Sequence, residues 1–182
     1  MGVLLLGCAT LASATGCSSQ PQATIAEGPL SAEQIQEART QAEIVVRANL
    51  TGQHDKAIEL THRSIIALVG RDQLVAAARS VARSIKDNGY DPDTLEITVG
   101  ELGDRATVER ETFAVIPFTA VLQSAESKRT IPSFLVGVYD SRRQSWTFID
   151  GEGVKNGSIR KVLPNFPTLK IPTLPEPSTD KN

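Results

Sequence analysis

The spacing of apolar residues changes about halfway along the chain, and this change constrains the fold more than any other feature of the sequence. Before about residue 90, apolar residues recur at steps of three and four, as they do on one face of a helix. After that point they alternate with polar residues, as in half-buried strands. Helices followed by strands are typical of the α+β class. The sequence therefore predicts N-terminal helices packed on a curved antiparallel sheet of about four strands.

Three helical segments are expected in the first half. Ser31 and Gln34 form a capping box that begins a helix of about twenty residues, and Thr51-Gly52-Gln53 should end it. Its apolar face comprises Ile35, Ala38, Ala42, Val45 and Asn49. A second helix is predicted over residues 55–69 with Gly70 as its C-cap, and Asp72 is expected to cap a third. The stripe of the third helix comprises Leu74, Ala78, Val81 and Ile85. The first and third helices should lay these faces on one side of the sheet.

Four strands and a short closing helix are expected in the second half. The strands are predicted at residues 95–99, 106–123, 131–139 and 145–150, and the helix at residues 158–162. Pro117 lies inside the second of these strands. Because proline cannot donate a backbone hydrogen bond, it should occupy an edge position or a bulge.

The first seventeen residues carry no charge and are typical of an export signal. Their apolar run spans residues 3–15, whereas a helix that crosses a bilayer needs about twenty apolar residues. Both cysteines of the chain, Cys8 and Cys17, lie in this segment. No disulfide framework is therefore expected in the domain that follows.

The sequence Ala14-Thr15-Gly16-Cys17 resembles the lipobox of bacterial lipoproteins. The resemblance implies that Cys17 is acylated, becomes the new N-terminus and anchors an exported protein to the cell envelope. Ser18 resembles an outer-membrane address in a Gram-negative cell. Ordinary secretion and an unprocessed segment are the alternatives. The lack of a Lys or Arg before the apolar run suggests that the true start lies upstream of Met1.

Composition divides the remaining chain into a tether, one domain and a tail. Residues 18–30 are expected to be a flexible tether, residues 31–172 the domain, and residues 173–182 a proline-rich tail without regular structure. Leu163, Phe166, Leu169 and Ile171 should pack the segment before this tail onto the domain. A net charge of −2 and an aromatic content of 4% make nucleic acid an unexpected partner.

Three stretches of the domain resemble the nuclear-transport-factor-2-like, cystatin-like superfamily. They are the junction at residues 70–74, the strand at residues 115–118 and the ending at residues 145–151. The likeness covers about residues 31–172. It implies a sheet wrapped round a long helix with a cone-shaped pocket, and a homodimer formed through the open face of the sheet. The superfamily includes enzymes, binding proteins and dimerisation modules, so the fold does not determine the function.

The candidate pocket residues follow from that resemblance. Members that resemble ketosteroid isomerase use an Asp base and acidic hydrogen-bond donors in an apolar cone. Here that resemblance gives Tyr90 and Tyr139 as possible donors and Asp150 as a possible base, with Asp93 and Asp140 as further possible bases. Trp146 is added to the pocket candidates because its indole N–H needs a partner wherever it is buried. Turns, strand ends and core packing are simpler explanations for these residues. No catalytic residue is therefore assigned.

The two histidines give no reason to expect a metal. His54 and His62 lack a His-x-x-x-His pattern, and a metal site needs three or four clustered ligands. Both are expected at the surface, and no cofactor is predicted.

The leading hypothesis is a non-catalytic, lipid-anchored envelope protein that binds a small ligand or another protein. The alternative is a pocket enzyme, similar to an isomerase or hydrolase, acting on a small apolar substrate.

Overall fold

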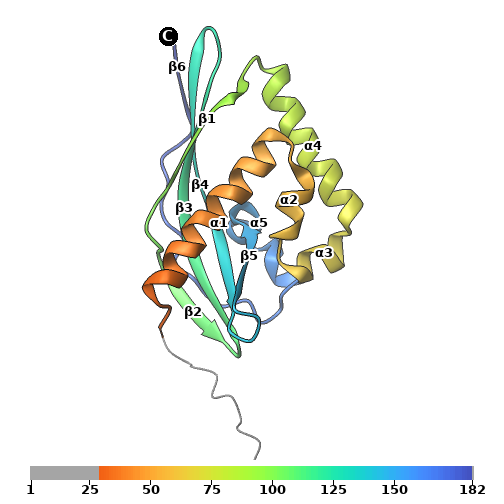
Figure 1. Ribbon diagram of the computed structural model, residues 1–182, viewed down its shortest axis with the longest axis vertical. Coiled ribbons are helices and arrows are strands. Elements are labelled where there is room, and N and C mark those ends of the chain that lie inside the picture. The colour runs from red at the N-terminus through yellow and green to blue at the C-terminus, as the bar shows by residue number, and fades with distance from the viewer. Residues whose placement is uncertain (1–28, 182) are drawn as a thin grey trace, which may run out of the picture.

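The computed structural model describes residues 29–181, and it confirms the α+β class. Figure 1 shows the helices α1–α4 gathered on one side of a strongly curved sheet. The elements on that side are α1 (Ala32–Thr51), α2 (His54–Glu59), α3 (Arg63–Val69) and α4 (Arg71–Asp87). The predicted signal peptide, Cys17 and all but the end of the predicted tether lie outside the described residues.

The long helix α1 begins and ends as the sequence predicts. The backbone N–H of Gln34 donates to Ser31 Oγ at 3.3 Å, and the N–H of Ser31 donates to Gln34 Oε1 at 2.8 Å, which completes the capping box. Gly52 ends the helix in the left-handed conformation, with φ of 83°. The buried residues Ala38 and Ala42 are small, so the helix backbone can lie close to the sheet.

The helix predicted over residues 55–69 is in fact two short helices, α2 and α3. The extended residues between them pair with the sheet: Phe148 N–H donates to the Leu60 carbonyl at 2.7 Å, and His62 N–H donates to the Phe148 carbonyl at 3.0 Å. These long-range hydrogen bonds outweigh local helix propensity. The prediction of Asp72 as a cap is also wrong, because Gly70 both ends α3 and precedes the first residue of α4.

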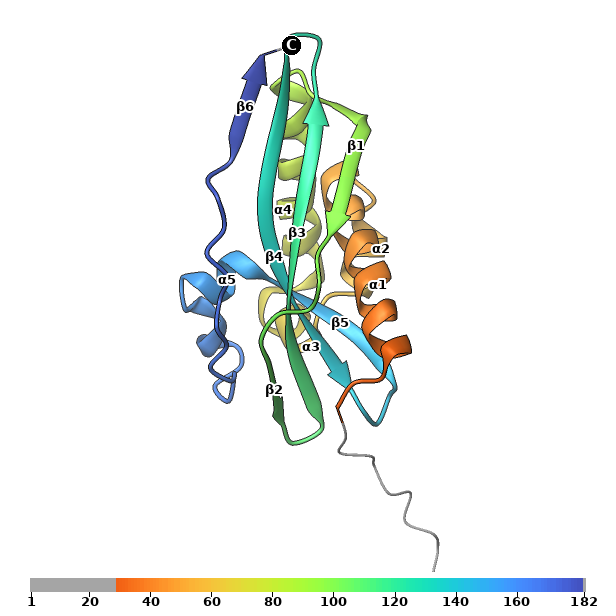
Figure 2. The ribbon, with the colours of Figure 1, turned by 90° about the vertical axis from the view of Figure 1, so that its left-hand side faces the viewer.

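The sheet is antiparallel throughout, with the central order β1-β3-β4-β5 (Figure 2). These strands span Asp91–Val99, Glu111–Gln123, Ser127–Asp140 and Ser145–Asp150. Two short strands extend it, since β2 (Arg105–Val108) pairs with β3 and β6 (Ser178–Lys181) pairs with β4. The sequence therefore finds the four main strands, merges β2 with β3 and misses β6.

Pro117 lies in the central strand β3, at a gap in its neighbours. On one side of β3, β1 ends at Val99 and β2 starts only at Arg105. Gly100 N–H donates to the Pro117 carbonyl at 2.8 Å within this gap. The proline nitrogen, which carries no hydrogen, thus faces a place where the strand pairing is interrupted. At any other position in a central strand, proline would remove a hydrogen bond from the ladder. The single strand predicted over residues 106–123 is in fact two strands, β2 and β3, joined by a turn in which Glu109 has a φ of 56°.

Part of the outer face of the sheet, turned away from α1, is covered by the end of the chain. Its buried residues include Phe113, Val115, Val136 and Val138. The helix α5 (Gly151–Lys155), the 3-10 helix η1 (Ser158–Lys161) and residues 163–174 lie against this face. The predicted packing of the segment from Leu163 to Ile171 is confirmed. The end of the chain thus covers part of the face expected to pair two copies of the protein, while Glu96 and Thr98 of β1 on that face are exposed.

The tail is more ordered than proline content suggests. Residues 173–182 are predicted to lack regular structure, but β6 pairs with residues 127–130 of β4. Proline is absent from β6 itself, so its N–H groups are free to form a ladder.

Among residues 29–181, none of the helices has the length and apolar character needed to cross a membrane.

Candidate functional site

An apolar cleft of about 520 Å³ lies between the helices and the inner face of the sheet. All four helices α1–α4 contribute to its wall, together with β3, β4, β5, α5 and η1. Its aliphatic and aromatic lining includes Val45, Val46, Leu50, Ile58, Ile65, Val69, Leu74, Val81, Phe118, Ile131, Leu135, Phe148, Ile149, Ile159 and Val162. We refer to this space as the apolar cleft.

The cleft exists because α3 and α4 cover the sheet loosely. The predicted stripe of α4 does face inward, since Leu74, Ala78 and Val81 line the cleft. Yet Ala82 is the one buried residue of that helix, and Val81 remains 46% exposed. Leu68 on α3 is 62% exposed. The stripe therefore borders a space instead of packing on the sheet, and the cleft reaches solvent beside Val81.

Few polar side chains line the cleft, and three of them are already engaged. Thr61 Oγ1 donates to the Ala57 carbonyl at 3.0 Å, and Ser158 Oγ donates to the Gly153 carbonyl at 3.2 Å. The Asp150 carboxylate accepts the N–H of Glu152 at 2.8 Å and so caps α5.

The other two polar side chains of the lining are Asn49 and Ser133. Neither side chain has a hydrogen-bond partner within the described part of the chain. No Lys, Arg, His or Tyr is among the described residues that line the cleft.

The four predicted pocket residues do not form one pocket. Tyr139 and Trp146 pack together in the core beneath α1, with ring centroids 5.2 Å apart. The Tyr139 hydroxyl accepts a hydrogen bond from Gln34 Nε2 at 2.7 Å, whereas Trp146 Nε1 is buried without a partner among the described residues. Asp150 alone of the four lines the apolar cleft.

Tyr90 stands apart, directly before β1. A hydrogen bond with Ser127 lowers the pKa of the Tyr90 hydroxyl, and further bonds to Thr179 and Arg129 act in the same direction. Tyr90 therefore belongs to the end of the sheet where β6 is added, far along the strands from Tyr139. The partners explain its hydroxyl without a ligand.

His62 is the polar residue that sequence reasoning missed. It is only 2% exposed, which contradicts the predicted surface position. Its Nδ1 accepts the N–H of Ser64 at 3.3 Å, capping α3, and its Nε2 lies 3.5 Å from Glu111 Oε1. Desolvation lowers the pKa of His62, against the opposing effect of the Glu111 carboxylate. The folded protein thus holds a neutral imidazole at the start of α3.

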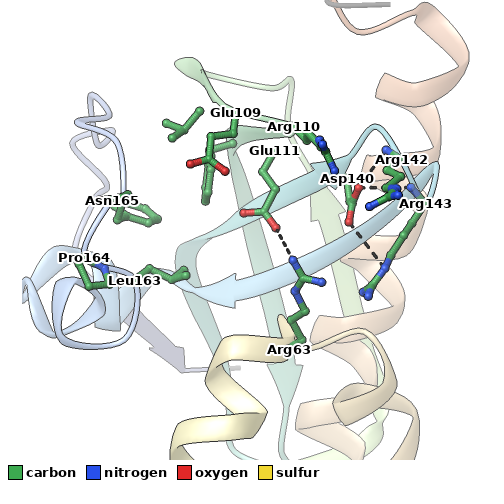
Figure 3. A pocket seen from close by; sticks show the side chains of 13 residues that line it. Arg63, Glu109, Arg110, Glu111, Asp140, Arg142, Arg143, Leu163, Pro164 and Asn165 are labelled. Carbon is green, nitrogen blue, oxygen red and sulfur yellow. Dashed lines mark hydrogen bonds and ion pairs between the residues drawn. The ribbon is translucent and has the colours of Figure 1, made fainter. Parts of the chain in front are cut away.

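A second, charged hollow of about 1030 Å³ lies near His62, between the β2–β3 and β4–β5 turns and residues 163–166. Figure 3 shows the Glu111 carboxylate directed toward Arg63, and Asp140 beside Arg143. The closest N–O distances of these pairs are 3.6 Å and 3.7 Å. Because two of its four arginines, Arg63 and Arg143, already face carboxylates, this hollow has less excess charge to attract a ligand than the number of arginines suggests.

Metal-ligating side chains do not gather anywhere in residues 29–181, where no group of three His, Cys, Asp or Glu residues could hold an ion. The apolar cleft is therefore the candidate site with the most distinctive chemistry. Comparison of the chain with models of known families, with curated proteins and with solved structures gives no match. The function must accordingly be argued from the cleft itself.

Proposed function

We propose that this protein is a non-catalytic envelope protein, lipid-anchored through Cys17, that binds a small apolar ligand in the apolar cleft. One observation carries the ligand-binding part: an aliphatic wall encloses a space of about 520 Å³ that reaches solvent. Sites for small molecules are typically apolar concavities of about 300–1000 Å³ with a few polar groups. The cleft has both properties.

The physical basis of binding is the incomplete packing of the lining. Side chains that border a void lack contacts on one side, and dispersion forces are lost there. An apolar ligand would restore those contacts and remove its own surface from water, at about 25 cal/mol per Å² of apolar area. The exposed position of Val81 gives such a ligand an entrance beside α4.

The same lining favours binding over catalysis. General acid–base chemistry needs a titratable group positioned at the reacting atoms. The lining offers one, Asp150, whose carboxylate is engaged at the N-terminus of α5. The alternative, a pocket enzyme acting on a small apolar substrate, would have to work with this carboxylate alone.

The binding proposal is tested by filling the cleft. The probe is N-phenyl-1-naphthylamine, an uncharged apolar dye that fluoresces when bound. The variant Ala78→Trp places an indole in the cleft, and we expect its dye affinity to fall about tenfold or more. The control Ala76→Trp adds the same indole to the exposed face of α4. Unchanged dye binding by the correctly folded Ala78→Trp variant would refute this site.

The anchor proposal has a separate test. It rests on the uncharged apolar segment and the lipobox-like residues that end at Cys17. Mass spectrometry of the membrane fraction of the native host should find an acylated Cys17 at the N-terminus, and Cys17→Ala should abolish the acylated form. An intact Met1 in the mature protein would contradict the proposal.

A further inference from the structure

We infer that the apolar cleft selects uncharged amphiphiles, whose hydrogen-bonding head group is recognised by Asn49 and Ser133. The inference rests on the proposed ligand-binding function and specifies the chemical class of the ligand. Long-chain alcohols and monoacylglycerols belong to this class. Three features of the lining lead to it: two unengaged neutral polar groups, the absence of a cation, and one carboxylate.

Asn49 is a polar residue on the apolar face of α1. It follows Val45 and Val46 by four and three residues, so all three share one face of the helix. All three line the apolar cleft, yet the Asn49 amide has no hydrogen-bond partner in the described part of the chain. Asn49 is half-buried, and once a ligand displaces water from the cleft, its amide costs free energy unless it is hydrogen-bonded. A ligand head group would supply that bond.

Ser133 offers a second neutral group from the opposite wall. It lies on β4 directly across from Phe118 of β3, and both residues line the cleft. A serine hydroxyl and an asparagine amide can each donate and accept a hydrogen bond. Together they suit a hydroxyl group, which both donates and accepts, and a carbonyl group, which accepts. The aliphatic side chains around them suit the chain of the ligand.

The charges of the lining disfavour an ionic head group. A buried charge is costly unless it is paired, and among its described lining residues the cleft has no Lys, Arg or His to pair a carboxylate or phosphate. The Asp150 carboxylate would repel such an anion. A cationic head group gains little from Asp150, because that side chain is exposed and already caps α5.

The test compares three ligands that share one chain: decan-1-ol, decanoate and decylamine. Each displaces the bound N-phenyl-1-naphthylamine from the full chain at pH 7.5. We expect the alcohol to act at a concentration about tenfold lower than either ion. Tighter binding of decanoate or decylamine would overturn the inference.

Variants of the two polar residues test their roles. Asn49→Leu keeps the approximate volume and removes the amide, and Ser133→Ala removes the hydroxyl. We expect each variant to bind decan-1-ol about five- to tenfold more weakly and to bind decane with unchanged affinity. The control Asn165→Leu makes the same change at an exposed residue of the charged hollow. Unaltered decan-1-ol affinity in Asn49→Leu and Ser133→Ala would also overturn the inference.

Failure of the inference can be told apart from failure of the proposed function. If the dye binds and Ala78→Trp excludes it, but all three ligands compete equally, the cleft is a binding site without the proposed selectivity. If the dye does not bind, or binds Ala78→Trp as it does the native chain, the proposed function fails and the inference fails with it.

Discussion

The two faces of the same sheet are covered in different ways. On the outer face, Phe166 of the C-terminal segment is 4% exposed and meets Phe113 edge to face, with ring centroids 5.5 Å apart. On the inner face, α1 packs closely, but α3 and α4 stand over a cleft of about 520 Å³. The chain thus closes the part of the outer face around Phe113 and leaves space on the inner face.

The difference lies in the covering segments, since strands β3 and β4 supply both faces. The C-terminal segment places large side chains directly on the sheet. In α4 the inward residues include Ala77 and Ala78, which are too small to fill the distance to the strands. Regions with few buried apolar contacts are the least stable parts of a protein and the usual places for ligand-dependent motion. Stability and binding are therefore expected to depend on different faces.

The largest effect should come from breaking the closed face. Phe166→Ala removes a buried ring and its aromatic partner contact, and we expect it to cost about 3–5 kcal/mol of unfolding free energy. Urea denaturation measures the loss. Leu68→Ala is the control on the helical side, where 62% exposure predicts a small change. A cost below about 1 kcal/mol for Phe166→Ala would mean that the C-terminal segment does not seal the sheet.

The second-largest effect should come from overpacking the core beneath α1, and its size tests how far close packing extends there. A Cβ at Gly137 would lie 2.8 Å from Ile116 Cδ1 and 3.0 Å from the Trp146 ring. We expect Gly137→Ala to destabilise the protein by about 1–3 kcal/mol through overpacking. In the control Gly103→Ala, the new Cβ stays 3.6 Å from Val115. Equal thermal stability of the two variants would show that the inner face is loose even beneath α1.

The third prediction concerns the point where α3 is fastened to the sheet. Burial lowers the pKa of His62, so below pH 6.5 the unfolded chain binds a proton that the folded chain resists. Its contribution is therefore complete above pH 6.5 and is lost as the pH falls toward the folded pKa. One proton gives a slope of at most about 1.4 kcal/mol per pH unit.

The measurement is urea denaturation at several values between pH 7.5 and pH 5. Carboxylates titrate in the same range, so the slope is compared with that of His62→Gln, in which we expect a shallower dependence. Protonation of Nδ1 also removes the acceptor for the Ser64 N–H, so α3 should fray first. Identical slopes in the two proteins would contradict the role given to His62.

The smallest effect should come from the open side of the cleft. Val81→Ala removes two methyl groups from a side chain that is 46% exposed, and we expect a change within about 0.5 kcal/mol in unfolding free energy. Thermal unfolding followed by circular dichroism is sufficient. A cost above about 1.5 kcal/mol would show that α4 packs on the sheet in solution and that the cleft is closed there.

The sequence predicts those elements whose determinants lie close together in the chain. The Ser31–Gln34 capping box and the stop at Gly52 depend on neighbouring residues, and both are correct. The extended residues 60–62 are missed because their hydrogen bonds go to Phe148 of β5. The β2–β3 turn is missed because Glu109 adopts a positive φ without a glycine or asparagine to indicate it.

The candidate site was less accessible to prediction, for a related reason. The stripe of α4 shows which side faces inward, but the distance between α4 and the sheet depends on how α2 and α3 are placed. Tyr139 and Trp146 carry polar atoms on strands, as pocket residues do, and only α1 lying over them makes them core. The burial of His62 depends on Glu111, which belongs to a strand formed by a distant part of the chain.

The pairing of β6 with the tip of the β3–β4 hairpin has a practical consequence for attachment. The start of α1 lies toward one end of the long axis, and β6 lies at the other end, beside the tip of the β3–β4 hairpin (Figure 1). A molecule immobilised through its N-terminal side would present its hairpin outward and keep the α3–α4 flank clear of the support. A fluorophore joined after β6 would report on the far end of the sheet, while the entrance beside Val81 stays unobstructed.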